Sequence, residues 1–189
     1  MTPLLRRGLL LEYATIGWNV LEGAGAITVG IAAHSVALTA YGLDSSIEVF
    51  ASTVTTWQLR NGSKRSEGPA LRAIGACYLV VAAYIGAEAT LHLVRGSRPS
   101  SSAIGIALTA AAVVVMTVLG IWKRNVGRDL SNNVLLAEAN FSLVDAALSG
   151  TVLLGLALYS SLGWWWADPV AACAVAVLAV SEGIEGVRG

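Results

Sequence analysis

Apolar residues occur along this chain in six long blocks that short polar stretches separate. Each block reaches the roughly 20 mostly apolar residues that a helix needs to cross a hydrocarbon core about 30 Å thick. Because backbone polar groups must pair internally in lipid, each block is predicted to be a helix. The pattern therefore predicts an all-α integral membrane protein, a six-helix transmembrane bundle. The predicted spans are 9–32, 35–59, 70–94, 103–122, 134–160 and 167–187.

Composition agrees with this prediction and leaves little room for another domain. Hydrophobic residues make up 56% of the 189 residues, and charged residues make up only 13%. We expect a single transmembrane domain over 1–189, with no soluble catalytic module and no cleaved signal peptide. Without a soluble basic surface, nucleic acid is excluded as a partner. The lipid bilayer is the expected surrounding.

The basic residues lie mainly at one set of block ends. Of the twelve Lys and Arg residues, ten lie near the termini, in or beside the polar stretch 60–69 (Arg72 flanks it), or in the polar stretch 123–132, and only Arg95 and Arg98 lie opposite. By the positive-inside rule, both termini are predicted to be cytoplasmic. The three tryptophans of 164–166 are expected in the opposite interfacial belt. We expect a multi-pass protein of the bacterial plasma membrane.

Acidic residues inside the apolar blocks are the main indication of function. A charge at the membrane centre costs about 2.5–3.5 kcal/mol, so such residues typically mark a bundle interior, an ion pathway or a proton relay. Solvation explains most acids here, which lie at block ends or in loops. No basic residue is expected at comparable depth, so the deep acids are predicted to be protonated or to bind a cation. Those deep acids are Glu22, Asp44, Glu48, Glu88 and Asp145, with Glu138 about one turn into its block.

Asp44 and Glu48 are four residues apart, so a helix places both on one face, about one turn apart. Two like charges at this range repel in a low dielectric, and the pair is expected to hold a proton when no cation is bound. A divalent cation reverses that preference and releases the proton, which is the linkage that a metal–proton antiporter would use. Protonated acids that bond neighbouring helices are the structural alternative.

The fifth block carries a second acidic face. Asp145 lies near its middle, Glu138 lies two turns earlier on the same face, and Ser142 lies between them. A faint repeat also relates this block to the second one, and chance similarity is its alternative. Because the two helices run in opposite directions, such a repeat would be inverted, with its site near the midplane. A shift of 97 residues lays Ala40 on Ala137, Ser45 on Ser142, Glu48 on Asp145 and Ser52 on Ser149.

Three stretches resemble the transmembrane domain of the cation diffusion facilitator family, which are divalent-metal/proton antiporters with six helices and cytoplasmic termini. They are HSVALTAYGLDSSIEVF, NNVLLAEANFSLVDAALSG and WADPVAACAVAVLAVSEGIEGV. Members typically carry two metal ligands four residues apart on helix two, and a His (or Asp or Asn) four before an Asp on helix five. Asp44 and Glu48 match the first pair, and Asp145 matches the final Asp.

One ligand of that pattern is missing, because Phe141 stands where the helix-five His usually lies. Glu138 or Asn140 is the expected replacement, and Glu22 or Asn19 could also fill the gap. Zinc normally takes four ligands with His or Cys among them, whereas carboxylates favour harder ions such as manganese or iron. The sequence therefore predicts a metal site without naming its metal.

The chain stops at Gly189, where most family members continue into a metal-binding cytoplasmic domain that holds the dimer. We expect that domain to be absent here, so a homodimer would form through transmembrane helices. The small-residue stretches 23–30 and 171–179 allow close helix approach, either in a dimer or inside one bundle.

The predicted function is secondary transport that exchanges a divalent cation of the zinc, manganese or iron class for protons, with export from the cytoplasm. The metal is cargo, and no prosthetic group is expected. No HExxH or GxSxG motif supports an intramembrane enzyme. The alternative is a membrane interaction or assembly protein that keeps the cation-efflux fold without transport, which the unusual Phe141 and the early end of the chain favour.

Overall fold

The chain folds into a bundle of long helices. The computed structural model describes residues 2–32, 36–96 and 103–188, and the regular structure within these ranges is helical throughout. The elements are α1 (Pro3–Ala32), α2 (Val36–Asn61), the 3₁₀ turn η1 (Lys64–Ser66), α3 (Glu67–Arg95), α4 (Ala103–Leu130), α5 (Asn133–Leu162) and α6 (Ala167–Arg188). All six predicted helices are therefore confirmed.

Four of the helical stretches in the described ranges are long and apolar enough to cross a membrane, and these confirm the predicted helical membrane protein. They are Lys64–Arg95, Ile106–Leu130, Asn133–Leu162 and Pro169–Arg188.

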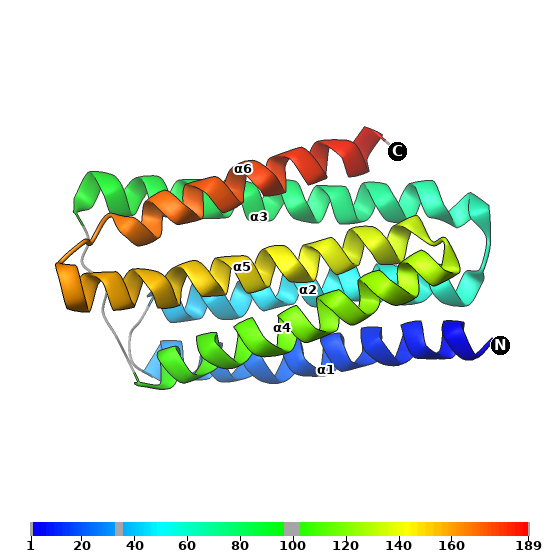
Figure 1. Cartoon of the computed structure of the whole chain (residues 1–189), viewed down its shortest axis with the longest axis horizontal. Helices are drawn as coiled ribbons and strands as arrows, with labels where there is room; N and C mark the ends of the chain where they lie inside the picture. Colours follow the sequence, from blue (N-terminus) through cyan, green and yellow to red (C-terminus); the bar gives the residue numbers. More distant parts are fainter. Residues whose placement is uncertain (1, 33–35, 97–102, 189) are drawn as a thin grey trace.

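Consecutive helices run in opposite directions along the long axis of the bundle, and both termini lie at the same end (Figure 1). The connections from α2 to α3 and from α4 to α5 lie at that end too. The basic residues of these connections and of the termini therefore share one end, as the charge pattern predicted. The cytoplasmic placement of this end stays a prediction. Arg98, which the charge pattern assigned to the opposite side, lies outside the described residues.

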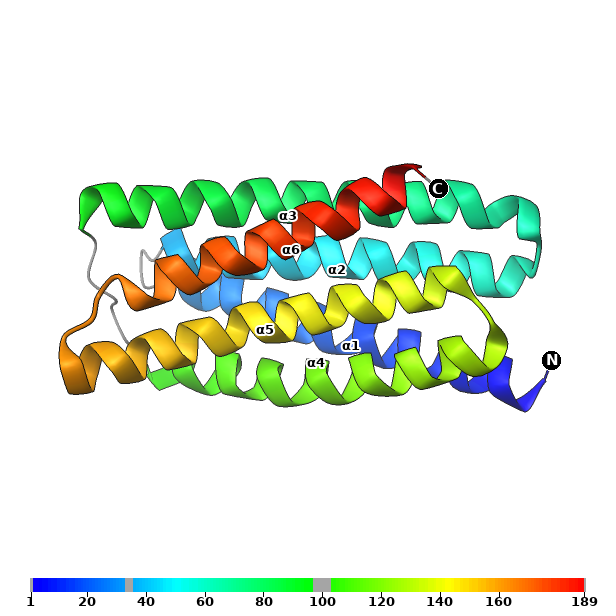
Figure 2. The same ribbon diagram turned by 45° about the horizontal axis from the view of Figure 1, so that its top comes forward.

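The helices pack mainly in pairs, with α1 against α2, α3 against α6 and α4 against α5. Helix α5 also contacts α2, α3 and α6, so it holds the pairs together. Figure 2 shows α5 between α4 and α6, and Figure 1 shows α2 partly behind α5. Asn132 starts α5, because its side-chain oxygen accepts a hydrogen bond from the Leu135 N–H at 2.8 Å. Gly163 ends α5 in the left-handed conformation, at φ 71°.

Glycines allow the closest contacts between paired helices. A Cβ on Gly42 of α2 would lie 2.7 Å from the carbonyl oxygen of Gly23 on α1. A Cβ on Gly75 of α3 would lie 2.8 Å from the carbonyl oxygen of Gly183 on α6. The small residues at these positions therefore serve packing inside one bundle, the second of the two uses expected for stretch 23–30. A homodimer stays a prediction.

Helix α4 is longer than its apolar block predicted. The predicted span ended at 122, but α4 continues into the polar stretch 123–132 as far as Leu130. The buried positions of α4 recur every three or four residues and define an inward face. Lys123 lies on that face and is fully buried, with 0% exposure. This overturns the expectation that no basic residue reaches the depth of the acids. The other buried positions of α4 are Thr109, Ala112, Met116, Leu119, Gly120 and Gly127.

Candidate metal site

A line of polar side chains runs along the interface between α2 and α5, which we call the α2–α5 seam. The two helices are antiparallel (Figure 1), and each contributes three residues at spacings of three or four, so each set faces one way. The seam therefore has three levels, each with one residue from either helix. The levels are Ser52 with Glu138, Glu48 with Ser142, and Asp44 with Asp145.

The first two levels each join an acid to a hydroxyl. Ser52 Oγ donates a hydrogen bond to Glu138 Oε1 at 2.7 Å. At the next level the roles of the helices are exchanged, because Ser142 Oγ on α5 donates to Glu48 Oε1 on α2, also at 2.7 Å. All four side chains are buried. The hydroxyls therefore satisfy part of the hydrogen-bonding capacity of two buried carboxylates.

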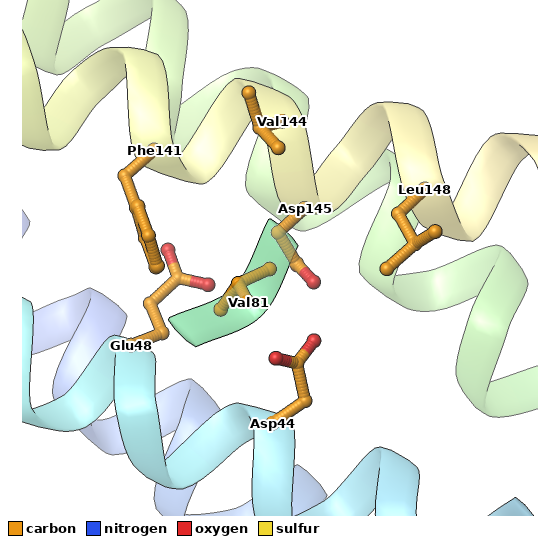
Figure 3. A pocket seen from close by; sticks show the side chains of 7 residues that line it. All are labelled: Asp44, Glu48, Val81, Phe141, Val144, Asp145 and Leu148. Atoms are coloured by element: carbon orange, nitrogen blue, oxygen red, sulfur yellow. The ribbon is translucent and has the colours of Figure 1, made fainter. Parts of the chain in front are cut away.

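The third level joins two acids instead of an acid and a hydroxyl. Figure 3 shows the carboxyl groups of Asp44 and Asp145 pointing toward each other across a small cavity, with Glu48 beside them. The cavity measures about 10 Å³, roughly the room that one water molecule needs. Its other lining residues are apolar, namely Val81, Phe141, Val144 and Leu148.

Several acidic side chains lie in or near this cavity. Glu22 of α1 is buried and interacts electrostatically with both Asp44 and Asp145. Charges this close repel strongly away from water, so a cation between them would be held favourably. In the described part of the chain, no three His, Cys, Asp or Glu side chains already form a closed metal-binding group. The three acids line the cavity without converging on one point.

The opposite end of the seam contains a buried ion pair. Lys123 Nζ lies 2.6 Å from Glu138 Oε2 and donates a hydrogen bond to Glu138 Oε1 at 2.7 Å. It also donates to Ser142 Oγ at 2.6 Å. Glu12 of α1, at 0% exposure, interacts electrostatically with Glu138 and Lys123. Solvation was the expected explanation for Glu12, and its burial overturns that interpretation.

The predicted site residues fall into separate groups. Asp44, Glu48 and Asp145 line one cavity, whereas Glu138 lies at the other end of the seam, paired with Lys123. Asn140 contacts a different region, because its Nδ2 lies 3.4 Å from Glu182 Oε2 on α6. This contact borders a second cavity of about 230 Å³ between α3, α5 and α6.

Two other deep residues differ in their surroundings from the cavity acids. Glu88 was expected to face the bundle interior, but its side chain is 41% exposed and lies 3.5 Å from His92. Asn19 is buried on α1, where its Nδ2 donates to the Thr15 carbonyl at 3.1 Å. Neither residue lines the cavity between Asp44 and Asp145.

Lys123 and Glu12 are the two residues of this site that the sequence analysis missed. The signal for Lys123 was the spacing of Ala112, Met116 and Gly127, which continues the inward face of α4 past its apolar block. A similar spacing of Leu9, Thr15 and Asn19 places Glu12 on the buried face of α1. In both cases the polar residue follows the period of its buried neighbours.

Comparison with known families assigns this architecture. The family described as the cation efflux transmembrane domain matches residues 14–188. The chain belongs to the cation efflux family. This confirms the resemblance found in the sequence. Cation efflux is transport, so the family agrees with the expectation that the chain is not an enzyme.

Several curated relatives share this transmembrane region. The chain is 24% identical to the magnetosome protein MamB of Magnetospira sp. over 92% of its length, and spans 61% of that protein. It is 29% identical to an uncharacterised transporter of Synechocystis sp., over 86% of its length and 54% of the relative. It is 32% identical to the cadmium, cobalt and zinc/H(+)-K(+) antiporter of Bacillus subtilis, over 65% of its length and 39% of the relative.

The family and the four long apolar helices confirm a multi-pass integral membrane protein, and the bacterial relatives agree with the predicted plasma membrane location. Within the cation efflux family, Phe141 departs from the expected ligand pattern. It is 4% exposed, lines the cavity and packs edge-to-face on Tyr78, with ring centroids 4.7 Å apart. The side chain at this position thus faces the cavity, but it offers an apolar ring.

Proposed function

We propose that this chain carries a divalent transition-metal cation through the membrane in exchange for protons, with Asp44, Glu48 and Asp145 as the metal ligands. The observation that carries the proposal is that these three acids, from two antiparallel helices, line one small cavity (Figure 3). A cation entering the cavity would relieve the repulsion between the carboxylates and release their protons. Return of protons would then expel the metal. Export from the cytoplasm is the direction that we propose.

The metal ligands in this proposal are oxygen atoms. Glu138 is left out because Lys123 and Ser52 already bind its carboxylate, and Asn140 is left out because its amide faces Glu182. Phe141 supplies no donor, so water is the natural fourth ligand. An all-oxygen set favours ions of the manganese or iron class over zinc. The Bacillus relative, named for cadmium, cobalt and zinc, supports metal–proton exchange as the general chemistry.

Uptake into proteoliposomes under a pH gradient tests this proposal, with manganese, iron, cobalt, zinc and cadmium as the panel. We expect gradient-dependent uptake of at least one metal by the wild type and its loss in Asp44→Asn. The matched control is Glu88→Gln, which neutralises a half-exposed acid away from the seam. Absence of uptake of every metal by the wild type would overturn the proposal.

A second function has one observation in its favour. An apolar ring at Phe141 occupies the cavity wall where family members typically present a ligand. A chain that has lost transport and serves membrane assembly would tolerate such a change. The same uptake assay separates the two functions, because the assembly protein would move no metal in either variant or wild type.

A further inference from the structure

The buried ammonium of Lys123 has no part in the exchange just described, yet it is connected to the site. We infer that Lys123 is a positioning residue for the metal ligand Glu48, acting through the hydroxyl of Ser142. The inference rests on the proposed function, because it assigns to Lys123 and Ser142 the orientation of one of the proposed ligands. It adds a fixed protein cation to a site otherwise described by its acids.

The direction of every hydrogen bond in this chain of contacts follows from the ammonium group. An ammonium can only donate, so Ser142 Oγ, at 2.6 Å from Lys123 Nζ, is the acceptor. The single hydroxyl proton of Ser142 is therefore available to a different partner. That partner is Glu48 Oε1, at 2.7 Å. Lys123 thus fixes Ser142 as a donor toward Glu48 and leaves Glu48 Oε2 available to an ion in the cavity.

The backbone makes this arrangement possible. Glu138 and Ser142 are four residues apart on α5, so one ammonium reaches both from the facing helix α4. Glu138 compensates the charge of Lys123, while Ser52 binds the same carboxylate from α2. Without Glu138 the ammonium would be a buried cation lacking its closest partner, which is a strongly destabilising state. The ion pair therefore holds Lys123 in place, and Lys123 in turn orients Ser142.

The charged groups that face Lys123 come from three helices. Glu138 of α5 is in direct contact, and Glu12 of α1 and Glu48 of α2 interact with it electrostatically. All are buried. Since Lys123 bonds both Glu138 and Ser142, loss of its ammonium would free the Ser142 hydroxyl to turn to the carbonyl of its own helix. Glu48 would then lose its donor and its fixed orientation.

The first test compares metal uptake by wild type, Ser142→Ala and Ser142→Thr in proteoliposomes. We expect Ser142→Ala to raise the metal KM about ten-fold, the typical order for one hydrogen bond to a charged group, with little change in maximal rate. Ser142→Thr keeps the hydroxyl and should restore KM. Ser149→Ala is the matched control, because Ser149 is buried on the same helix and its hydroxyl has no hydrogen-bond partner within the described chain. It should leave KM unchanged.

The second test removes the ion pair as a unit. Lys123→Met with Glu138→Gln replaces two charges by neutral groups of similar size, which avoids leaving a lone buried charge. We expect the same rise in KM as in Ser142→Ala, and no further rise when Ser142→Ala is added. Wild-type KM and metal preference in both Ser142→Ala and the double variant would overturn the inference while leaving transport intact. A wild type without uptake would instead refute the proposed function, and the inference with it.

Discussion

The two ends of the α2–α5 seam use the same helices and the same spacing but have different partners. At one end Glu138 is bound by Lys123 and Ser52, so its charge and one of its oxygens are satisfied within the protein. At the other end Asp44 and Asp145 face each other across a cavity. A buried acid with a protein cation beside it is part of the structure. Two partly buried acids that face each other inside a membrane protein require a cation or protons from outside.

This difference explains why acids on one helix face can have different roles. Glu138 and Asp145 lie two turns apart on the same face of α5, and depth in the apolar block made both candidates for the metal. The deciding factor is the neighbouring helix, because Lys123 of α4 bonds Glu138 directly but is linked by hydrogen bonds to Glu48 through Ser142.

The largest effect is expected from removing Lys123, the cation at the Glu138 end of the seam. Lys123→Met leaves Glu138 and Glu12 buried without their positive partner, and breaking a buried pair in this way typically costs about 3–5 kcal/mol. We expect only a small fraction of this variant to be folded, as measured by thermal unfolding in detergent. Adding Glu138→Gln should restore stability. A stable Lys123→Met single variant would show that the ion pair does not hold the bundle.

One substitution can make the Asp44–Asp145 level resemble the other two levels of the seam, which each join an acid to a hydroxyl. Asp145→Ser replaces one of two facing acids by a hydroxyl that can donate to Asp44. Metal uptake should be lost, while the free energy of unfolding should rise by about 1 kcal/mol, the net value of one hydrogen bond. Uptake and denaturant unfolding on the same preparation provide the two measurements. Loss of stability together with loss of uptake would mean that Asp145 supports the fold instead of the site.

Phe141 tests whether the cavity wall sets metal preference. Phe141→His places a nitrogen ligand beside the three acids, which should shift preference toward zinc over manganese by about ten-fold, equivalent to about 1.4 kcal/mol. Some stability should be lost with the edge-to-face contact to Tyr78. Phe141→Leu is the control for that packing loss. An unchanged metal preference in Phe141→His would place the new side chain outside the coordination sphere.

The smallest effect is expected at Asn140. Its contact with Glu182 is long, at 3.4 Å, and lies in the second cavity, so Asn140→Ala should change the metal KM by less than about two-fold. Uptake kinetics measured beside Asp44→Asn give the comparison. A large rise in KM would return Asn140 to the ligand set.

The sequence predicts much of the fold because lipid imposes strict requirements on it. The presence of each helix follows from the length of its apolar block. The placement of Asp44 and Glu48 on one helix face follows from their spacing of four residues. The burial of Lys123 was missed because the positive-inside rule assigns a basic residue at the end of an apolar block to a loop. Only the packing of α4 on α5 shows that the residue points inward. The partner of each acid is a tertiary property, which spacing along one helix cannot determine.

The decisive measurement is proton release when the cavity acids bind a metal. Manganese or zinc is added to the purified wild type in weakly buffered detergent, and released protons are counted beside bound metal. We expect metal binding by the wild type to release protons, and we expect Asp44→Asn with Asp145→Asn to abolish both. Metal binding of unchanged affinity in the double variant, or binding without proton release in the wild type, would show that these acids do not exchange protons for a metal.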